Sequence, residues 1–432
     1  MSILILHKKN LSRRRHLAAA QRYARDHGER LLLVMRDPTW EAGYADRVAV
    51  ADTSSIDETL AVARELAATE DEPITAVASF AEAAVPAVAR IAAQLGLPAV
   101  SERSARLARD KHAMRTAFAA AGDVPQPRFG LARTVEEACE VARTTGYPVV
   151  LKPVLGTGSM YVRSVDDEDE LRAHFEFLRS GAWSGFQADP LYREAHDEYR
   201  GALLMEAFVA GPEICVDSLV VDGVTYVVAI HDKPLPTGPT FEEVYACTPT
   251  RLPADVVARV VAATEAAHAA LSIRMGATHV EFRLRDGIEP VMLEAAARMG
   301  GGPIYRSVEL STGVDMVRAI LDLASGRTPV LRLPERATPV GFWNIFPDHA
   351  GALTAVHGLA AAREDSRADE VAIYRSLGEH LAVPPQTFQG HGHLIFTTAE
   401  QDELDEVFRH FVRTLRLETA AERPVRDEVT VG

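Results

Sequence analysis

The chain has 432 residues and a formal net charge of −15, with 47% hydrophobic and 25% charged residues. This composition is typical of a soluble globular protein of about two to four domains, and the acidity argues against a nucleic-acid-binding surface, which needs clustered basic residues. The three cysteines are widely spaced and form neither a disulfide framework nor a zinc motif. The apolar segment 2–6 is too short for a signal peptide, and no apolar run approaches the roughly 18 residues of a membrane span. We therefore expect a cytoplasmic protein that binds neither nucleic acid nor membranes.

The first hundred residues alternate short apolar runs with helical patterns. The order is strand 3–6, helix 12–27, strand 31–34, strand 48–51, helix 56–68, strand 74–79 and helix 81–95. Such alternation predicts a parallel sheet in an α/β domain. The G-x-G-x-x-G fingerprint is absent after the first strand, so we do not expect a dinucleotide site there.

The rest of the chain mixes helices and strands. A helix at 104–121 is followed by a proline-rich stop, a capping box at Thr134–Glu137 opens a helix that ends at Gly146, and 181–200 is predicted to be a surface insertion. Further strands are expected at 148–152, 202–206, 213–221, 225–231, 277–284 and 289–294, with a helix at 253–271 and a linker at 326–334. The last hundred residues suggest an α+β region that ends in a helix at 399–415. The fold class is therefore α/β and α+β.

Two glutamates stand in neighbouring apolar strands. Glu281 and Glu294 belong to runs that the turn Arg285–Gly287 would join as a hairpin. Unpaired charges are costly to bury, and a divalent cation would remove that cost, since Mg²⁺ binds one or two carboxylates together with substrate phosphates. The alternative is two glutamates that each form a salt bridge with an arginine.

A lysine precedes a glycine-containing turn. Lys152 ends a strand, and the turn Gly156-Thr157-Gly158-Ser159 follows it. Backbone amides in such a turn can bind phosphate oxygens while the lysine supplies charge, but the order differs from that of a Walker motif. An ordinary hairpin turn is the alternative.

Two further segments carry candidate ligand-binding groups. Arg298 precedes the glycine run 300–302, where backbone can approach a ligand closely and an arginine can hold a carboxylate or phosphate; an incidental arginine in a flexible loop explains it equally well. The strand that ends at Glu206 leads through a glycine turn to Glu213, whose carboxylate could accept bonds from ribose hydroxyls. Exposure of that carboxylate to water is the alternative.

Taken in order, these segments resemble the ATP-grasp superfamily of carboxylate–amine ligases. The specific motifs lie between 110 and 306, and the architecture matches over about 1–425. Within the superfamily, 276–282 together with Glu294-Ala295-Ala296-Ala297-Arg298-Met299-Gly300-Gly301 looks most like the bacterial L-amino-acid ligases, which form dipeptides or related amides. The resemblance implies an N-terminal Rossmann-like pre-ATP-grasp domain at 1–100, an ATP-grasp region at 101–330 with a lid at about 124–207 and the rest of its core at 208–330, and a C-terminal α+β domain at 331–432.

The resemblance also implies roles for individual residues. Lys111 and Lys152 would bind the α- and β-phosphates of ATP, and the loop Gly156, Thr157, Gly158 and Ser159 would close over these phosphates. The backbone of Glu206, Ala207, Phe208 and Val209 would bind adenine, and Glu213 would bind the ribose. Glu281 and Glu294 would hold two Mg²⁺ ions, with Mn²⁺ as a substitute. Arg298 would stabilise the acyl phosphate and the tetrahedral intermediate, Lys233 would lie near the γ-phosphate, and Arg306 would grip a substrate carboxylate.

The sequence departs from the superfamily pattern at Ala296, where many members have an asparagine that contacts the metal. The amino-acid ligases often share this departure. The glycine loop is also lean, with Thr157 and Ser159 where further glycines are common.

The expected reaction joins a carboxylate, from an amino acid, to the amine of a second amino acid through an acyl phosphate, with release of ADP and phosphate. The absence of a Ser/His/Asp or Cys/His signature agrees with a reaction that needs no nucleophilic side chain. Alternatives are a biotin-dependent or purine-pathway carboxylase, and a catalytically silent nucleotide-binding protein. Small-molecule amino acids are the expected partners, and the resemblance suggests a homodimer. We expect His391 and His393 to be structural strand residues and not metal ligands.

Overall fold

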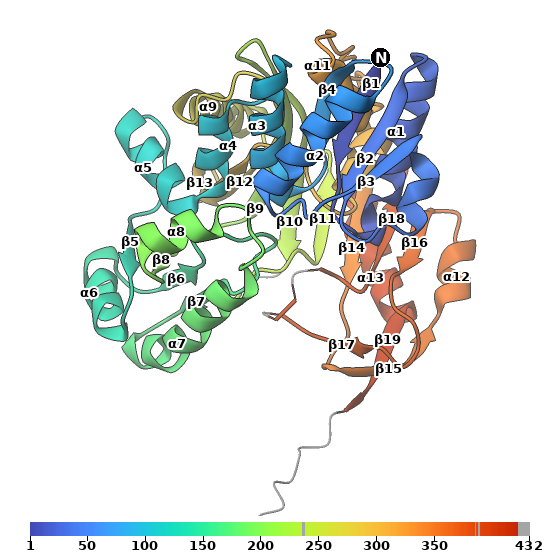
Figure 1. The fold of residues 1–432 in the computed structure, drawn as a ribbon. Coiled ribbons are helices and arrows are strands. Elements are labelled where there is room, and N and C mark those ends of the chain that lie inside the picture. The colour runs from blue at the N-terminus through green and yellow to red at the C-terminus, as the bar shows by residue number, and fades with distance from the viewer. Residues whose placement is uncertain (236–237, 385, 388, 422–432) are drawn as a thin grey trace, which may run out of the picture.

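The computed structural model describes residues 1–235, 238–384, 386–387 and 389–421, and these residues form four sheets (Figure 1). Residues 236–237, 385 and 388, together with 422–432 of the predicted C-terminal domain, lie outside the described residues. Within the described part, no helix has the length and apolar character that a membrane crossing requires.

The N-terminal sheet is parallel, in the order β3-β2-β1-β4, as predicted. Its central strand β1 is buried along its whole length, because helices cover both faces. The loops that follow β1 and β4 leave the same edge of the sheet, and each contains a short 3₁₀ helix, η1 (Leu11–Arg13) and η3 (Glu82–Ala84). The other elements are β1 (Ser2–Leu6), α1 (Arg14–Asp26), β2 (Arg30–Met35), η2 (Trp40–Tyr44), β3 (Arg47–Val50), α2 (Ile56–Thr69), β4 (Ile74–Ser79) and α3 (Val85–Leu95).

The single helix predicted at 104–121 is wrong, because the chain breaks at Asp110. Helix α4 (Glu102–Arg109) ends there and α5 (Lys111–Ala121) begins. Asp110 has an extended backbone, and its carboxylate accepts bonds from the Ala113 N–H at 2.9 Å and the Tyr199 hydroxyl at 2.7 Å. The break places Lys111 at the first position of α5, where its ammonium reaches Glu294 across the site.

A second, antiparallel sheet projects to one side of the molecule, at the lower left of Figure 1. Its strand order is β5-β8-β6-β7, with β5 (Phe129–Ala132), β6 (Val149–Lys152), β7 (Arg163–Val165) and β8 (Leu203–Ala207). Helices α6 (Val135–Thr145), α7 (Glu168–Gly185) and α8 (Tyr192–Tyr199) accompany it, and α6 begins at the predicted cap, Thr134.

The surface insertion predicted at 181–200 is therefore wrong. This segment is the end of α7 and the whole of α8, and Leu191, Ala195 and Tyr199 are buried against Val154 and Leu204. Helix α8 contains few apolar residues, so the hydrophobic periodicity of the sequence did not indicate that one of its faces is buried.

The largest sheet runs through the middle and the C-terminal part of the chain in the order β13-β12-β9-β10-β11-β14-β18-β16. Its strands are β9 (Glu213–Val221), β10 (Val224–Leu235), β11 (Tyr245–Thr248), β12 (Gly276–Arg285), β13 (Glu289–Ala296), β14 (Val340–Ile345), β16 (Ala368–Ile373) and β18 (Gly392–Thr397), accompanied by α9 (Ala254–Ala270), α10 (Ile304–Thr312) and α11 (Met316–Ala324). Because β11 pairs with β14, the sheet is continuous across the predicted domain boundary at 330/331.

A small sheet of three strands completes the described residues. It consists of β15 (Gly351–His357) between β17 (His380–Leu381) and β19 (Arg416–Ala421). Helices α12 (Leu359–Glu364) and α13 (Leu404–Thr414), with η4 (Gln401–Glu403) ahead of the latter, belong to the same part of the chain, and α13 buries Phe408 and Phe411 against the large sheet. These C-terminal strands and helices lie on the opposite side of the molecule from the projecting sheet (Figure 1).

Candidate active site

One cavity gathers every residue proposed from the sequence except Arg306. Its walls come from all three larger sheets: the loops after β1 and β4, strands β6 and β8 with the turn at 156–159, and the ends of β9, β10, β12 and β13. Segments more than 200 residues apart therefore face one space.

The acidic pair lies on the hairpin β12–β13, in which Glu281 and Glu294 are direct partners across the ladder. The register shifts immediately after Glu281, so a β-bulge sits beside the pair. Each carboxylate accepts a bond from a lysine, Glu281 from Lys233 at 3.0 Å and Glu294 from Lys111 at 2.9 Å. Although burial favours the neutral acid, Lys233 and His279 hold the pKa of Glu281 well below its usual range. Two carboxylates on one cavity wall are a donor set that fits Mg²⁺.

Lys152 and Glu206 form a buried ion pair of 2.7 Å at the junction of β6 and β8. Arg115 completes the group through two bonds to the same carboxylate, at 2.6 and 3.1 Å. Arg115 also donates to the carbonyl of Leu293, beside the bulge, at 2.7 Å. Burial lowers the pKa of Lys152 to about 8, against the opposing effect of Glu206, whereas the two cations lower the pKa of Glu206 to about 2. The Glu206 side chain is therefore a structural counter-ion in this wall.

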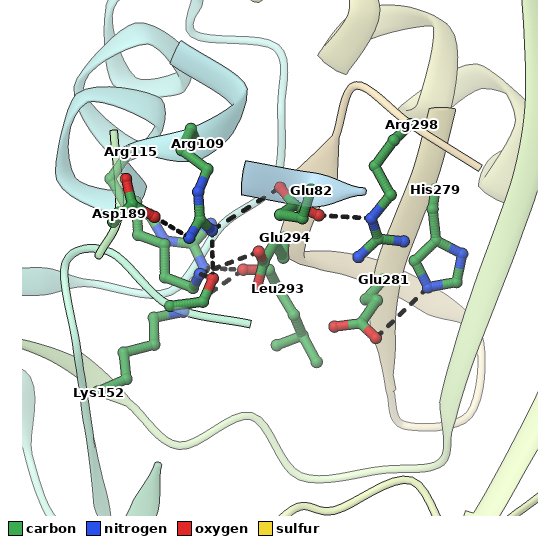
Figure 2. Close-up of polar contacts among 12 residues, drawn as sticks. Glu82, Arg109, Arg115, Lys152, Asp189, His279, Glu281, Leu293, Glu294 and Arg298 are labelled. Atoms are coloured by element: carbon green, nitrogen blue, oxygen red, sulfur yellow. Dashed lines mark hydrogen bonds and ion pairs between the residues drawn. The ribbon is translucent and has the colours of Figure 1, made fainter. Parts of the chain in front are cut away.

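Two cationic side chains hold the turn at 156–159 in place by hydrogen bonds. The carbonyl of Gly156 accepts from Arg109 at 2.5 Å and from Lys111 at 3.3 Å. Arg109 is buried and also pairs with Asp189, just ahead of α8, and with Glu82 of η3 at 3.8 Å. Figure 2 shows this line of polar contacts from Asp189 through Arg109 and Glu82 to Arg298. The segment predicted to be an insertion thus supports the turn at 156–159.

Replacement of Asp189 by Asn tests that support. Because Arg109 would lose its closest charged partner while remaining buried, we expect the free energy of unfolding to fall by about 1.5–3 kcal/mol. Thermal or urea unfolding measures this. The control is Glu194→Gln, which alters an exposed pair with Arg106 at 3.8 Å and should change stability little. Equal stability of the two variants would contradict the supporting role.

Part of the backbone that was predicted to bind adenine already forms hydrogen bonds within the protein. The N–H groups of Ala207 and Phe208 donate to the carbonyls of Arg128 and Pro148, at 2.9 and 3.0 Å. The Val209 N–H has no backbone acceptor among the described residues. Of these three N–H groups, only that of Val209 is left for a base.

Glu213 lies at the start of β9 and accepts from Lys233 at 2.7 Å and from Arg283 at 3.2 Å. Arg283 stacks over Phe208 and Phe241, with its guanidinium carbon 5.0 and 5.2 Å from the ring centres. This wall combines flat aromatic rings with a carboxylate, the combination that suits a nucleoside.

Arg298 is held in place by Glu82, with a second bond from its Nη1 to the Met299 carbonyl at 3.0 Å. Its guanidinium, Glu281 and Glu294 lie around the same space (Figure 2). The following loop is anchored by the Gly300 N–H, which donates to the buried Asp217 carboxylate at 2.9 Å. A Cβ at Gly300 would come within 2.3 Å of Ile304 and 2.8 Å of Asp217, so the close approach requires glycine.

Arg306 does not line this cavity. Its guanidinium makes two bonds to Asp369, at 2.9 and 2.5 Å, and one to Glu309 at 2.8 Å. It faces a neighbouring hollow beside α1 and β16. Because two carboxylates already engage it, the prediction that Arg306 grips a substrate carboxylate is not supported by its position.

Several residues that line the cavity were not predicted from the sequence. Glu82 and Arg13 follow the carboxyl ends of β4 and β1, His279 precedes Glu281 by two residues, and Glu243 lies ahead of β11. Burial raises the pKa of Glu243, whose carbonyl accepts from Asn344 at 2.9 Å. The first two could have been found, since ligands in open parallel sheets bind beyond the carboxyl ends of the strands.

Among the described residues, Cys215, Asp217 and His279 form a buried group whose donor atoms lie within 4.8 Å of one another. Asp217 already accepts from Gly300 and His279, and it raises the pKa of His279 to about 9 despite burial. A protonated imidazole is no metal ligand, so hydrogen bonding accounts for the cluster. His391 and His393 belong to no such group and contact Ala382 and Tyr374, respectively.

Comparisons with known proteins bear on the family and the fold. Residues 145–305 match the family described as the ATP-grasp domain, and residues 344–420 match L-amino acid ligase C-terminal domain 2. The uncharacterized protein y4rH of Sinorhizobium fredii is 27% identical over 89% of this chain and 77% of its own length. An alanine–anticapsin ligase of Bacillus subtilis is 28% identical over 64% of this chain, and the match spans 60% of that relative's length. The crystal structure of an L-amino acid ligase from Bacillus licheniformis superposes with a TM-score of 0.80 at 21% identity, over 97% of this chain and 99% of the other.

Proposed function

Because the chain is an ATP-grasp enzyme that also carries an L-amino acid ligase C-terminal domain, we propose that it joins the carboxylate of one amino acid to the amine of a second. ATP would activate the carboxylate as an acyl phosphate, and ADP and phosphate would be released. The fold and subgroup suggested by the sequence motifs are confirmed by the matched domains and by the structural likeness. The identity of the two amino acids and the roles of single residues are part of the proposal.

The observation that carries the proposal is the convergence of three lysines, two facing carboxylates and one arginine on a single cavity. Lys111, Lys152 and Lys233 come from three different parts of the chain. Each is held by an acidic partner at 2.7–3.0 Å, so their ammonium groups are already positioned. Phosphoryl transfer depends mainly on positioning and electrostatics, which is what such an array provides.

ATP would lie between the projecting sheet and the large sheet. Lys111 and Lys152 would bind its α- and β-phosphates under the 156–159 turn, the Val209 N–H would meet the base, and Glu213 the ribose. Glu281 and Glu294 would hold Mg²⁺, which screens phosphate charge when bound. Ala296 offers no oxygen for a further ligand, so coordination would depend on these two carboxylates and the phosphates.

The substrate carboxylate would attack the γ-phosphorus, giving an acyl phosphate and ADP. The amine of the second substrate would then attack the acyl carbon, forming the amide and expelling phosphate. Arg298 would stabilise negative charge in both steps. Segment 124–207, the proposed lid, would close its turn over the phosphates and keep water from the acyl phosphate.

A screen of all pairs of the twenty common L-amino acids tests the function. ADP release together with an amide product found by mass spectrometry is the expected result. A parallel reaction with bicarbonate in place of amino acids tests the carboxylase alternative. ATP turnover only with bicarbonate, or no ADP with any pair, would contradict the ligase.

Replacement of Lys152 by Arg tests the phosphate role of this lysine. The charge is retained, but a planar guanidinium does not fit a buried site that Arg115 already fills. We expect the KM for ATP to rise about 10- to 100-fold, since charged hydrogen bonds contribute about 1.5–3 kcal/mol. The control is Lys9→Arg at an exposed position. Wild-type kinetics in Lys152→Arg would show the assignment to be wrong.

A further inference from the structure

Arg13 lines the part of the cavity wall that is contributed by the loops of the N-terminal sheet. It belongs to η1, directly beyond the carboxyl end of β1, and its side chain is half-buried in the cavity wall. Its hydrogen bond runs from Nη1 to the carbonyl of Lys8 at 3.3 Å. Most of the N–H donors of the guanidinium are therefore available to bind a ligand.

Arg13 differs from every other cation of this cavity in lacking a carboxylate partner. Each of the others has an acidic oxygen within ion-pair distance, in the pairs Lys111–Glu294, Lys152–Glu206, Lys233–Glu213, Arg283–Glu213 and Arg298–Glu82. Among the residues that the structure describes, no carboxylate lies within 4 Å of the Arg13 guanidinium nitrogens. Among the described cations of this cavity, Arg13 is therefore the one whose charge is free to bind an anion.

The residues beside Arg13 on its own loop, Asn10 and Ser12, are neutral. Gln389 reaches across from the C-terminal part, donating to the Asn10 side chain at 3.0 Å. Burial and the nearby Arg298 lower the pKa of Arg13 to about 10, against the opposing effect of Glu82, which leaves Arg13 charged at neutral pH. Glu82 is already paired with Arg298 and Arg109, and no described carboxylate forms an ion pair with Arg13, so a bound substrate is the natural source of a counter-ion.

We infer that Arg13 binds the carboxylate of the amine-bearing substrate, the carboxylate that the reaction does not consume. This inference rests on the proposed function. The triphosphate has its own cations on the projecting and large sheets, and the reacting carboxylate belongs beside Arg298. A planar guanidinium with free donors suits a carboxylate held by two parallel bonds. The acceptor is therefore an amino acid with a free carboxylate, and not a simple amine.

Arg13→Gln tests this assignment with amino acids and their C-terminal amides as acceptors. In the wild-type enzyme the free amino acid should have the lower KM. In Arg13→Gln its KM should rise about 10- to 100-fold while the KM of the amide changes less than threefold. Arg13→Lys should fall between the two, and Arg25→Gln, an exposed arginine on α1, is the matched control.

Calorimetry gives a readout that does not need turnover. Acceptor amino acids are titrated into enzyme saturated with Mg²⁺ and a non-hydrolysable ATP analogue, and only the free acids should bind more weakly to Arg13→Gln. Equal losses for acid and amide, weaker binding of the ATP analogue, or no binding of any amino acid to the wild type would overturn the inference. If the wild type forms amides but Arg13→Gln retains its preference for the free acid, the inference fails and the proposed function stands.

Discussion

Glu294→Gln is expected to abolish ligation, with kcat/KM reduced at least about 10³-fold. The variant keeps the size of the side chain but removes the charge that faces Glu281 across the β12–β13 ladder. The glutamine oxygen can still accept from Lys111, which donates to Glu294 at 2.9 Å, so the main loss is the negative charge that we propose binds the metal. Coupled ADP assays over a range of Mg²⁺ and Mn²⁺ concentrations measure the loss.

Measurement of ATP binding in the absence of metal distinguishes the loss of a metal ligand from a general loss of the folded structure. In the presence of a chelator, Glu294→Gln should bind ATP at least as well as the wild type, because one negative charge facing the phosphates is gone. The control is Glu289→Gln on the same strand, an exposed glutamate paired with Arg285 at 3.1 Å, which should leave kcat/KM unchanged. Full activity in Glu294→Gln, or loss of metal-free ATP binding, would contradict the metal role.

The hairpin that carries the acidic pair was predictable because its signals are local. Two apolar runs and a turn with Gly287 between them define β12 and β13, and strand pairing then forces Glu281 and Glu294 to face each other. The alternation of strands and helices likewise predicted the parallel N-terminal sheet. Patterns of this kind depend on neighbours in sequence, which is all that one chain displays.

The break at Asp110 and the packing of α8 were not predictable in the same way. Residues 104–121 favour a helix throughout, and only the bonds of Asp110 to Ala113 and Tyr199 stop it. Tyr199 lies 89 residues away. Asp189 owes its importance to Arg109, 80 residues distant, so its burial becomes visible only when both elements are in place.

The partners of the site lysines show the same limit. The sequence singled out Lys111, Lys152 and Lys233 and also their acidic partners, but it did not predict that these residues pair with one another. Nor did it predict that Arg13 has no such partner among the described residues. Lys152–Glu206 and Lys233–Glu213 each join neighbouring strands of one sheet, and Lys111–Glu294 joins helix α5 to strand β13, so none of these pairs leaves a periodic signal in the sequence. Charge balance within a cavity is a property of the fold and not of any motif.

Arg298→Ala should reduce kcat about 10²- to 10³-fold, the loss that follows removal of one preorganised group that stabilises developing charge. Glu82 and the Met299 carbonyl hold the guanidinium in place before substrates bind, so its contribution needs little reorganisation. Because the predicted ATP contacts lie on other residues, the Kd for a non-hydrolysable ATP analogue should change less than threefold. Stopped-flow or steady-state kinetics together with calorimetry measure the two quantities.

The substitution also leaves Glu82 with Arg109, at 3.8 Å, as its remaining cation, so a loss of structure must be distinguished from a loss of chemistry. Arg298→Lys retains a positive charge for Glu82 but offers no planar pair of donors to the acyl phosphate. If Arg298 acts on the reacting group, the lysine variant should keep the wild-type melting temperature while kcat stays at least about tenfold low. Recovery of kcat in Arg298→Lys would show that only the charge beside Glu82 matters, and equal losses of kcat and ATP affinity in Arg298→Ala would move this residue from the chemistry to nucleotide binding.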